Sequence, residues 1–134
     1  MNILVIDGQG GGIGRQLVAS LKNYNPQLEI TAVGTNSAAT SAMLKAGADN
    51  AATGENAVIV GCRRADVIAG PVGIVIADSL FGEITPKMAL AVGQSSARRV
   101  LIPVNHCGNI VVGSANLPIA KLVDEAAKVI LEGE

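Results

Sequence analysis

The start of the chain joins an apolar run, through a turn rich in glycine, to a segment with helical spacing. The apolar run is Ile3–Ile6, the turn covers Asp7–Gly14, and the apolar residues that follow are Ile13, Leu17, Val18 and Leu21. A short run that is apolar throughout is typical of a strand buried on both faces. A strand that turns tightly into a helix begins a βαβ unit, so this start predicts a parallel α/β sheet.

Apolar runs and helical patterns continue to alternate to the end of the sequence. The spacing predicts further strands over residues 29–33, 48–52, 66–69 and 100–104, and helices over 37–46, 54–64, 85–95 and 119–131. A last short strand, Ile110–Val112, is expected to pair with 100–104 as a hairpin around the turn 105–109. Right-handed crossovers favour one Rossmann-like domain over residues 1–134, with a doubly wound, mostly parallel sheet and helices on both faces.

The composition is poor in charge and rich in apolar residues. Charged residues make up 16% of the sequence and hydrophobic ones 49%, whereas about 25% charged residues is typical of soluble domains. Such a surface predicts a homo-oligomer, in which another copy covers part of the chain. Asp7, Asp66 and Asp78 interrupt the most hydrophobic stretches, so we expect no membrane span. The N-terminus lacks the basic and apolar pattern of a secretion signal, which predicts a cytoplasmic protein.

The basic residues do not form the pattern of a nucleic-acid binder. Lysine and arginine are scattered apart from the pairs Arg63–Arg64 and Arg98–Arg99, and the formal net charge is −1. Tyr24 and Phe81 are the only aromatic residues, which leaves no row of rings on which bases could stack. We therefore expect no nucleic-acid partner.

The glycine turn is suited to a phosphate. Glycines let the backbone approach a ligand closely, and the N–H groups and dipole of the following helix favour negative charge. The sequence therefore predicts a small phosphate-bearing ligand, held by the turn and by the polar residues after the second strand. The candidate cofactor-binding residues are Gly8, Gln9, Gly10, Gly11, Gly12, Ile13, Gly14, Thr35 and Asn36. The alternative is that the glycines only permit tight packing of helix on strand.

The turn resembles the Gly-x-x-x-Gly-x-Gly turn of short-chain dehydrogenase/reductases, with Gly8, Gly12 and Gly14 at the glycine positions. The resemblance implies NAD or NADP as cofactor. The acidic residue that binds the ribose in NAD enzymes is missing after the second strand, where Gly34–Ser37 stands, and no Arg or Lys nearby completes an NADP signature. The Tyr-x-x-x-Lys pair is also absent, because Leu28 follows Tyr24 at that spacing. The nucleotide and the reaction stay open.

A second resemblance covers most of the chain. Residues 8–14, 48–57, 65–89, 93–95 and 102–105 are similar to a family of short bacterial proteins known as a domain of unknown function. This resemblance implies a small stand-alone domain. It implies no activity and no catalytic residues, so the functional hypotheses rest on the residues themselves.

Three functions remain open from the sequence. The first is a module that binds a nucleotide or phosphorylated metabolite. The second is a small atypical oxidoreductase or transferase that uses Asp78, Asn105 and His106, with Cys107 a further candidate only if a base lies within hydrogen-bond reach. The third is a structural subunit of a homo-oligomer that binds no ligand. The spacing predicts no metal site, and Ser79–Pro86 is expected to be an exposed stretch, either a lid or an oligomer contact.

Overall fold

Five parallel strands form the centre of the molecule, as a computed structural model of residues 1–104, 108–114 and 116–133 shows. The strands are β1 (Asn2–Asp7), β2 (Glu29–Gly34), β3 (Asn50–Thr53), β4 (Val67–Pro71) and β5 (Arg98–Ile102). The helices are α1 (Gly12–Tyr24), α2 (Ser37–Lys45), α3 (Glu55–Arg64), α4 (Pro86–Gln94) and α5 (Ile119–Glu132), with a short 3-10 helix, η1, at Val72–Val75. The five strands and the five α-helices lie near the positions that the sequence pattern predicts, whereas η1 is not predicted.

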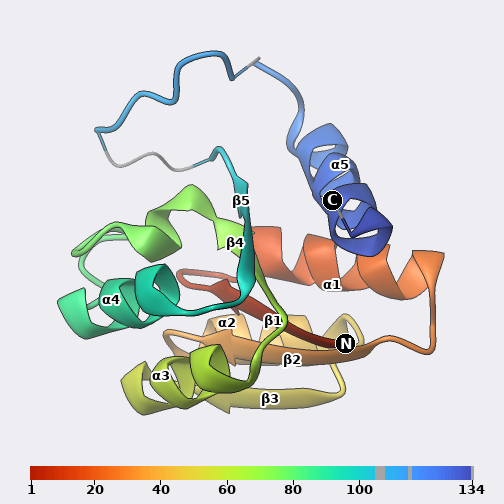
Figure 1. Cartoon of the computed structure of the whole chain (residues 1–134), viewed down its shortest axis with the longest axis horizontal. Helices are drawn as coiled ribbons and strands as arrows, with labels where there is room; N and C mark the ends of the chain where they lie inside the picture. The colour runs from red at the N-terminus through yellow and green to blue at the C-terminus, as the bar shows by residue number, and fades with distance from the viewer. Residues whose placement is uncertain (105–107, 115, 134) are drawn as a thin grey trace.

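Helices cover both faces of the sheet (Figure 1). Ile3 and Val5 of β1 pack in a core with α1, α2 and α5, whereas Leu4 and Ile6 pack in a second core with α3 and α4. Alternate side chains of a strand point to opposite faces, so a strand between two helical layers must be apolar at every position. This explains the continuous apolar run and confirms the doubly wound α/β fold.

The strand order creates a switch point beside β1. The order is β3-β2-β1-β4-β5, so the chain moves outward from β1 to β3 and then crosses back to β4. In open parallel sheets, ligands bind beyond the carboxyl ends of the strands at the point where the order reverses. The turn after β1 and the segment after β4 lie at this point.

Arg98 and Arg99 bind the ends of two helices, one on each face of the sheet. Arg98 donates to the carbonyl oxygen of Ile130 near the end of α5, at 3.1 Å, and Arg99 donates to the carbonyl oxygen of Ser95 just after α4, at 2.7 Å. The last carbonyl groups of a helix lack intrahelical partners and carry partial negative charge. The two arginines of β5 therefore stabilise one helix end on each side of the sheet.

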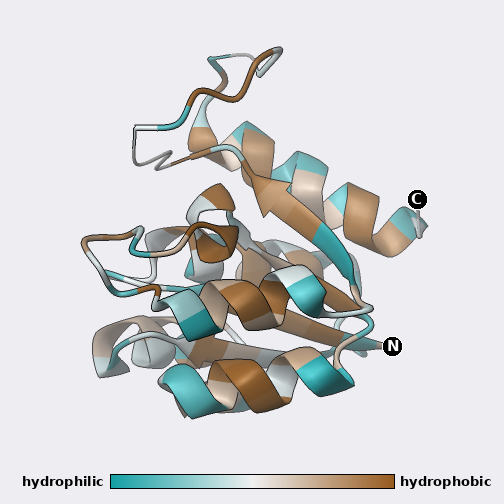
Figure 2. Cartoon of the chain, turned by 60° about the vertical axis from the view of Figure 1, so that its left-hand side comes forward, coloured by the Kyte–Doolittle hydropathy of each residue, from teal (hydrophilic) through white to brown (hydrophobic). Residues whose placement is uncertain are grey.

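The predicted strand Ile110–Val112 is wrong. Ile110 is 88% exposed and Val112 is 93% exposed, and neither belongs to a strand. Pro103 follows β5 directly and has no N–H to extend a ladder, so the chain leaves the sheet there and crosses to α5 (Figure 1). Much of this connection is apolar (Figure 2). Of the predicted hairpin turn, residues 105–107 lie outside the described residues.

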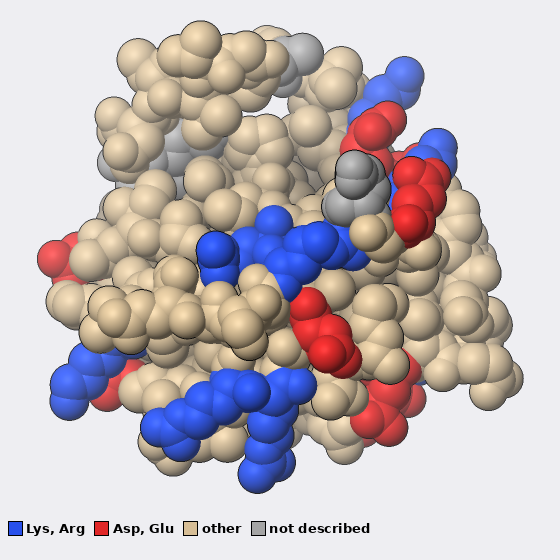
Figure 3. Space-filling view, viewed as in Figure 1, with Lys and Arg blue, Asp and Glu red and all other residues tan. Residues whose placement is uncertain are grey.

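Most of the face shown in Figure 3 is uncharged, and its basic side chains adjoin one another in a group near the centre and in another at the lower edge, with an acidic group between the two. In the described part of the chain, no helix is long and apolar enough to cross a membrane. The homo-oligomer expected from the composition stays a prediction.

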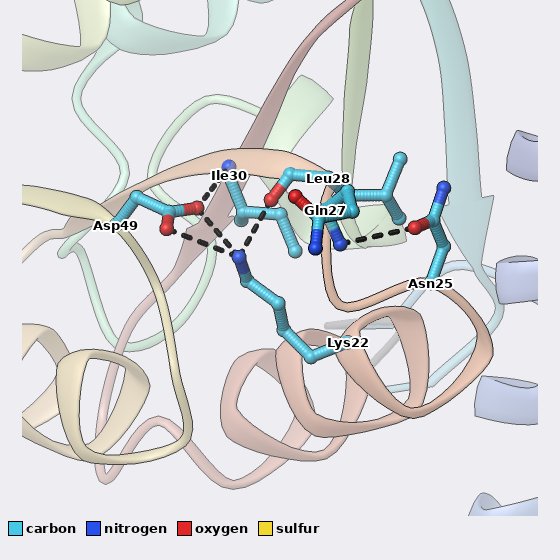
Figure 4. A network of polar contacts seen from close by, with 6 residues as sticks. All are labelled: Lys22, Asn25, Gln27, Leu28, Ile30 and Asp49. Carbon is cyan, nitrogen blue, oxygen red and sulfur yellow. Dashed lines mark hydrogen bonds and ion pairs between the residues drawn. The ribbon is translucent and has the colours of Figure 1, made fainter.

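A polar network ties α1 to the start of β2 (Figure 4). The ammonium group of Lys22 donates to the carbonyl oxygen of Leu28 at 2.6 Å and to the Asp49 carboxylate at 2.8 Å, and that carboxylate also accepts the N–H of Ile30 at 2.8 Å. The hydrogen bond from Lys22, followed by that from Ile30, lowers the pKa of Asp49. Asp49 thus joins three segments at the amino ends of the strands.

Replacing Asp49 by Asn should lower the free energy of unfolding by about 0.5–1 kcal/mol at neutral pH, a value discounted because the side chain is 41% exposed. A carboxyl whose pKa is lowered by folding stabilises the protein above its unfolded-state pKa, and that contribution is lost as the pH falls through the folded-state value. The free energies of unfolding of the wild type and of Asp49→Asn, measured with denaturant, should therefore become equal at acid pH. Glu29→Gln is the matched control, and an equal loss in it would contradict the assignment.

Candidate ligand site at the glycine turn

Asp7 holds the glycine turn from the inside. Its carboxylate accepts the N–H of Gly8 at 2.8 Å and the N–H of Gly14 at 2.6 Å, and the residue is only 4% exposed. Burial raises the pKa of Asp7, while the hydrogen bonds from Gly14, Gly8 and Ile13 oppose that rise and the charge of Glu83 adds to it. The end of β1 is thus fixed to the first turn of α1 by the protein's own carboxylate.

Three of the glycines are required by packing. A Cβ on Gly14 would lie 2.5 Å from the sulfur of Met43, and one on Gly8 would lie 2.7 Å from the hydroxyl oxygen of Thr35. Gly11 has a φ of +72°, and a Cβ there would lie 2.9 Å from the Cα of Ala39. These positions bring the turn against α2 and the end of β2, as the alternative of tight packing predicts.

The other two glycines of the turn face open space. A Cβ on Gly10 or Gly12 would meet no atom within 4 Å. Within the described residues, the backbone N–H groups of Gly10 and Gly12 have no hydrogen-bond acceptor. A hollow of about 210 Å³ lies beside them, and its lining residues are Asp7, Gly8, Gln9, Gly10, Gly12, Ile13, Gln16 and Ile119. Two unpaired N–H donors at the start of α1 are suited to an anion.

A carboxylate from the segment after β4 closes the other side of the turn. The Oε1 atom of Glu83 accepts the N–H of Gln9 at 2.7 Å, the hydroxyl of Thr35 at 2.6 Å and the amide of Asn36 at 3.0 Å. Partial burial raises the pKa of Glu83, but the hydrogen bonds from Thr35, Gln9 and Asn36 outweigh it and lower the pKa overall. Glu83 therefore holds its negative charge beside Gln9 and the end of β2.

Sequence reasoning missed Glu83, because its partners lie 47 to 74 residues away along the chain. The one local signal was the pair Thr35–Asn36, two hydrogen-bond donors at the end of β2 with no acidic residue beside them in sequence. The structure brings Gln9, Thr35 and Asn36 together around this carboxylate.

The stretch Ser79–Pro86 is not exposed as a whole, and that prediction is corrected. Ser79 and Leu80 are each 2% exposed, and the Ser79 hydroxyl donates to the carbonyl oxygen of Gly73. Phe81, by contrast, is 97% exposed. Asp78, Leu80 and Phe81 have φ values of 67°, 57° and 56°, a region that side chains adopt only when their surroundings enforce it. The buried residues Ser79 and Leu80 therefore hold Phe81 in a strained, exposed position.

Of the remaining candidates from the sequence, Asp78 lies among the described residues. Asp78 is exposed, and its N–H donates to the carbonyl oxygen of Ile84 at 2.7 Å. Burial raises the pKa of Cys62 to about 11, so this thiol is protonated at neutral pH. Asn105, His106 and Cys107 lie outside the described residues. Among the residues that are described, no group of three or more His, Cys, Asp and Glu side chains could hold a metal ion.

The sequence of residues 2–133 matches the family described as Domain of unknown function (DUF3842). The chain belongs to this family. No curated protein matches the sequence. Among solved structures, the chain is similar to a dodecameric FMN-dependent UbiX-like decarboxylase from Escherichia coli O157:H7, with 17% identity and a TM-score of 0.46 over 100% of this chain and 95% of that one.

Alanine substitutions should separate the two classes of glycine. Gly14→Ala forces its Cβ against Met43 and should destabilise the fold by about 1–3 kcal/mol. Gly12→Ala adds a methyl group in open space at the start of α1 and should be neutral or stabilise by up to about 1 kcal/mol. Denaturant unfolding of both variants measures the difference, and equal losses would contradict the assignment.

The pH dependence of Asp7 can be tested with Asp7→Asn. Folding raises the pKa of Asp7 above its ordinary value of 3.8, so its contribution to stability is full below that value and is lost as the pH rises through the folded-state pKa. The unfolding free energy of the wild type minus that of the variant should therefore fall as the pH rises through this window. A difference that grows with pH would mean that the N–H donors outweigh burial.

Proposed function

We propose that this protein binds a nucleotide or a phosphorylated metabolite, with a phosphate on the N–H groups of Gly10 and Gly12. The observation that carries the proposal is the pairing of these open glycines with the hollow of about 210 Å³ at the start of α1. Gly8 and Gly14 give their N–H groups to Asp7, so the phosphate contacts the outer part of the turn only.

The charges around the hollow favour a single phosphate. None of its described lining residues is a lysine or an arginine, so the donors are backbone N–H groups and the positive end of the α1 dipole. The Asp7 carboxylate points inward to Gly8 and Gly14, which limits its repulsion of the ligand. A phosphate held without a cationic side chain binds weakly and depends on the rest of the ligand for affinity.

The size of the hollow bears on the cofactor. Pockets that enclose a whole drug-sized ligand measure roughly 300–1,000 Å³, so a space of about 210 Å³ is suited to a phosphate and the adjoining sugar. NAD or NADP, the cofactors implied by the glycine pattern, would have to extend over the surface beyond it. A mononucleotide or a sugar phosphate fits the space more completely.

The test is calorimetry and thermal unfolding with NAD, NADP, ATP, FAD, FMN and AMP, each against the wild type, Gly12→Val and Gly93→Val. A ligand at 100 times its dissociation constant should stabilise the wild type by about 2.7 kcal/mol. Gly12→Val fills the space beside the turn and should abolish the shift. Gly93→Val is the matched control, because Gly93 also lies in a helix with no atom near its Cβ position. No shift with any ligand would overturn the proposal.

A further inference from the structure

Glu83 has one carboxylate oxygen that is fully used and one that is not. Oε1 accepts three hydrogen bonds, from Gln9, Thr35 and Asn36. Oε2 accepts none from the residues that the structure describes. Because three donors fix the carboxylate, Oε2 is a preorganised acceptor beside the phosphate-binding turn.

The neighbours of Glu83 act as its supports. Asn36 donates its amide to Glu83 at 3.0 Å and to the carbonyl oxygen of Gln9 at 2.9 Å, while its own oxygen accepts the N–H of Ala39. Thr35 donates its hydroxyl to Glu83. Both residues thus donate to the carboxylate, and Asn36 donates also to the glycine turn at Gln9. Gln9, which lines the hollow, binds Oε1 of Glu83, so the carboxylate lies next to the hollow without lining it.

The same contacts determine the charge of the Glu83 side chain. Three donors on one oxygen favour the ionised carboxylate, and no described lysine or arginine forms an ion pair with Glu83. Gln9, which binds it, is adjacent to Gly10. A hydroxyl group of a bound sugar would donate to Oε2, whereas a second phosphate at the same place would meet a negative charge at short range.

We infer that Glu83 determines the specificity of the site by accepting hydroxyl groups of the ligand sugar and by excluding a second phosphate beside Gln9. The inference rests on the proposed function and names its ligand class: a sugar phosphate or nucleotide with one phosphate on Gly10 and Gly12 and free sugar hydroxyls toward Glu83. Thr35 and Asn36 are positioning residues for that carboxylate.

The experiment compares two nucleotides that differ by one phosphate on the ribose, adenosine 5′-monophosphate and adenosine 2′,5′-bisphosphate. Calorimetry on the wild type should show roughly tenfold tighter binding of the monophosphate, the effect of one partly screened charge pair. Glu83→Gln keeps the shape and an acceptor oxygen but removes the charge, so the preference should fall to about threefold or less. Glu29→Gln removes an equal charge at the opposite end of the sheet and should retain it.

A measurement on the wild type alone keeps the inference testable if Glu83→Gln does not fold. A preference that arises from charge should shrink between about 0.05 M and about 0.5 M salt, and a preference that does not change with salt would contradict the assignment. Equal affinities in the wild type, or an unchanged preference in Glu83→Gln, would overturn the role of Glu83 while leaving the phosphate site intact. Failure of both nucleotides to bind the wild type would overturn the role of Glu83, and it would overturn the proposed function as well if NAD, NADP, ATP, FAD and FMN also fail to bind.

Discussion

The buried carboxylate of Asp7 is the interaction on which the glycine turn depends. It ends β1, and its two oxygens accept N–H groups from both sides of the turn, at Gly8 and Gly14. A helix start has several N–H groups without partners, and here the chain satisfies the inner ones itself. The outer ones, at Gly10 and Gly12, have no acceptor among the described residues and are the donors of the proposed site. The proposed binding surface is therefore smaller than the number of glycines indicates.

The segment after β4 packs against the glycine turn, and each helps to fix the conformation of the other. Asp78, Leu80 and Phe81 adopt left-handed conformations, which cost of order 1–3 kcal/mol each and persist only where the surroundings fix them. Burial of Leu80 near Gly8 and the hydrogen bonds of Glu83 provide that constraint. The segment thus covers the part of the switch point next to Gly8.

Local patterns predict this fold well and its site only in part. The five parallel strands follow from short apolar runs, and the first turn of α1 follows from its glycines, since both signals lie within a few consecutive residues. Ile110–Val112 has the same apolar character but lies beyond Pro103, where no neighbouring strand receives it. Glu83 could not be found in this way, because its role arises from contacts between β1, β2 and the segment before α4 that only the folded chain creates.

In the proposed site, the carboxylates would select among phosphate-bearing ligands. A phosphate site lined with arginines tolerates several phosphates, because each adds a favourable contact. In the proposed site the donors are two backbone N–H groups, and the ionisable side chains nearby are the acidic ones of Asp7 and Glu83. Each further phosphate would add repulsion without gaining a cation. The proposed ligand therefore has one anionic end for the start of α1 and a neutral, hydroxyl-rich body on the side of Glu83.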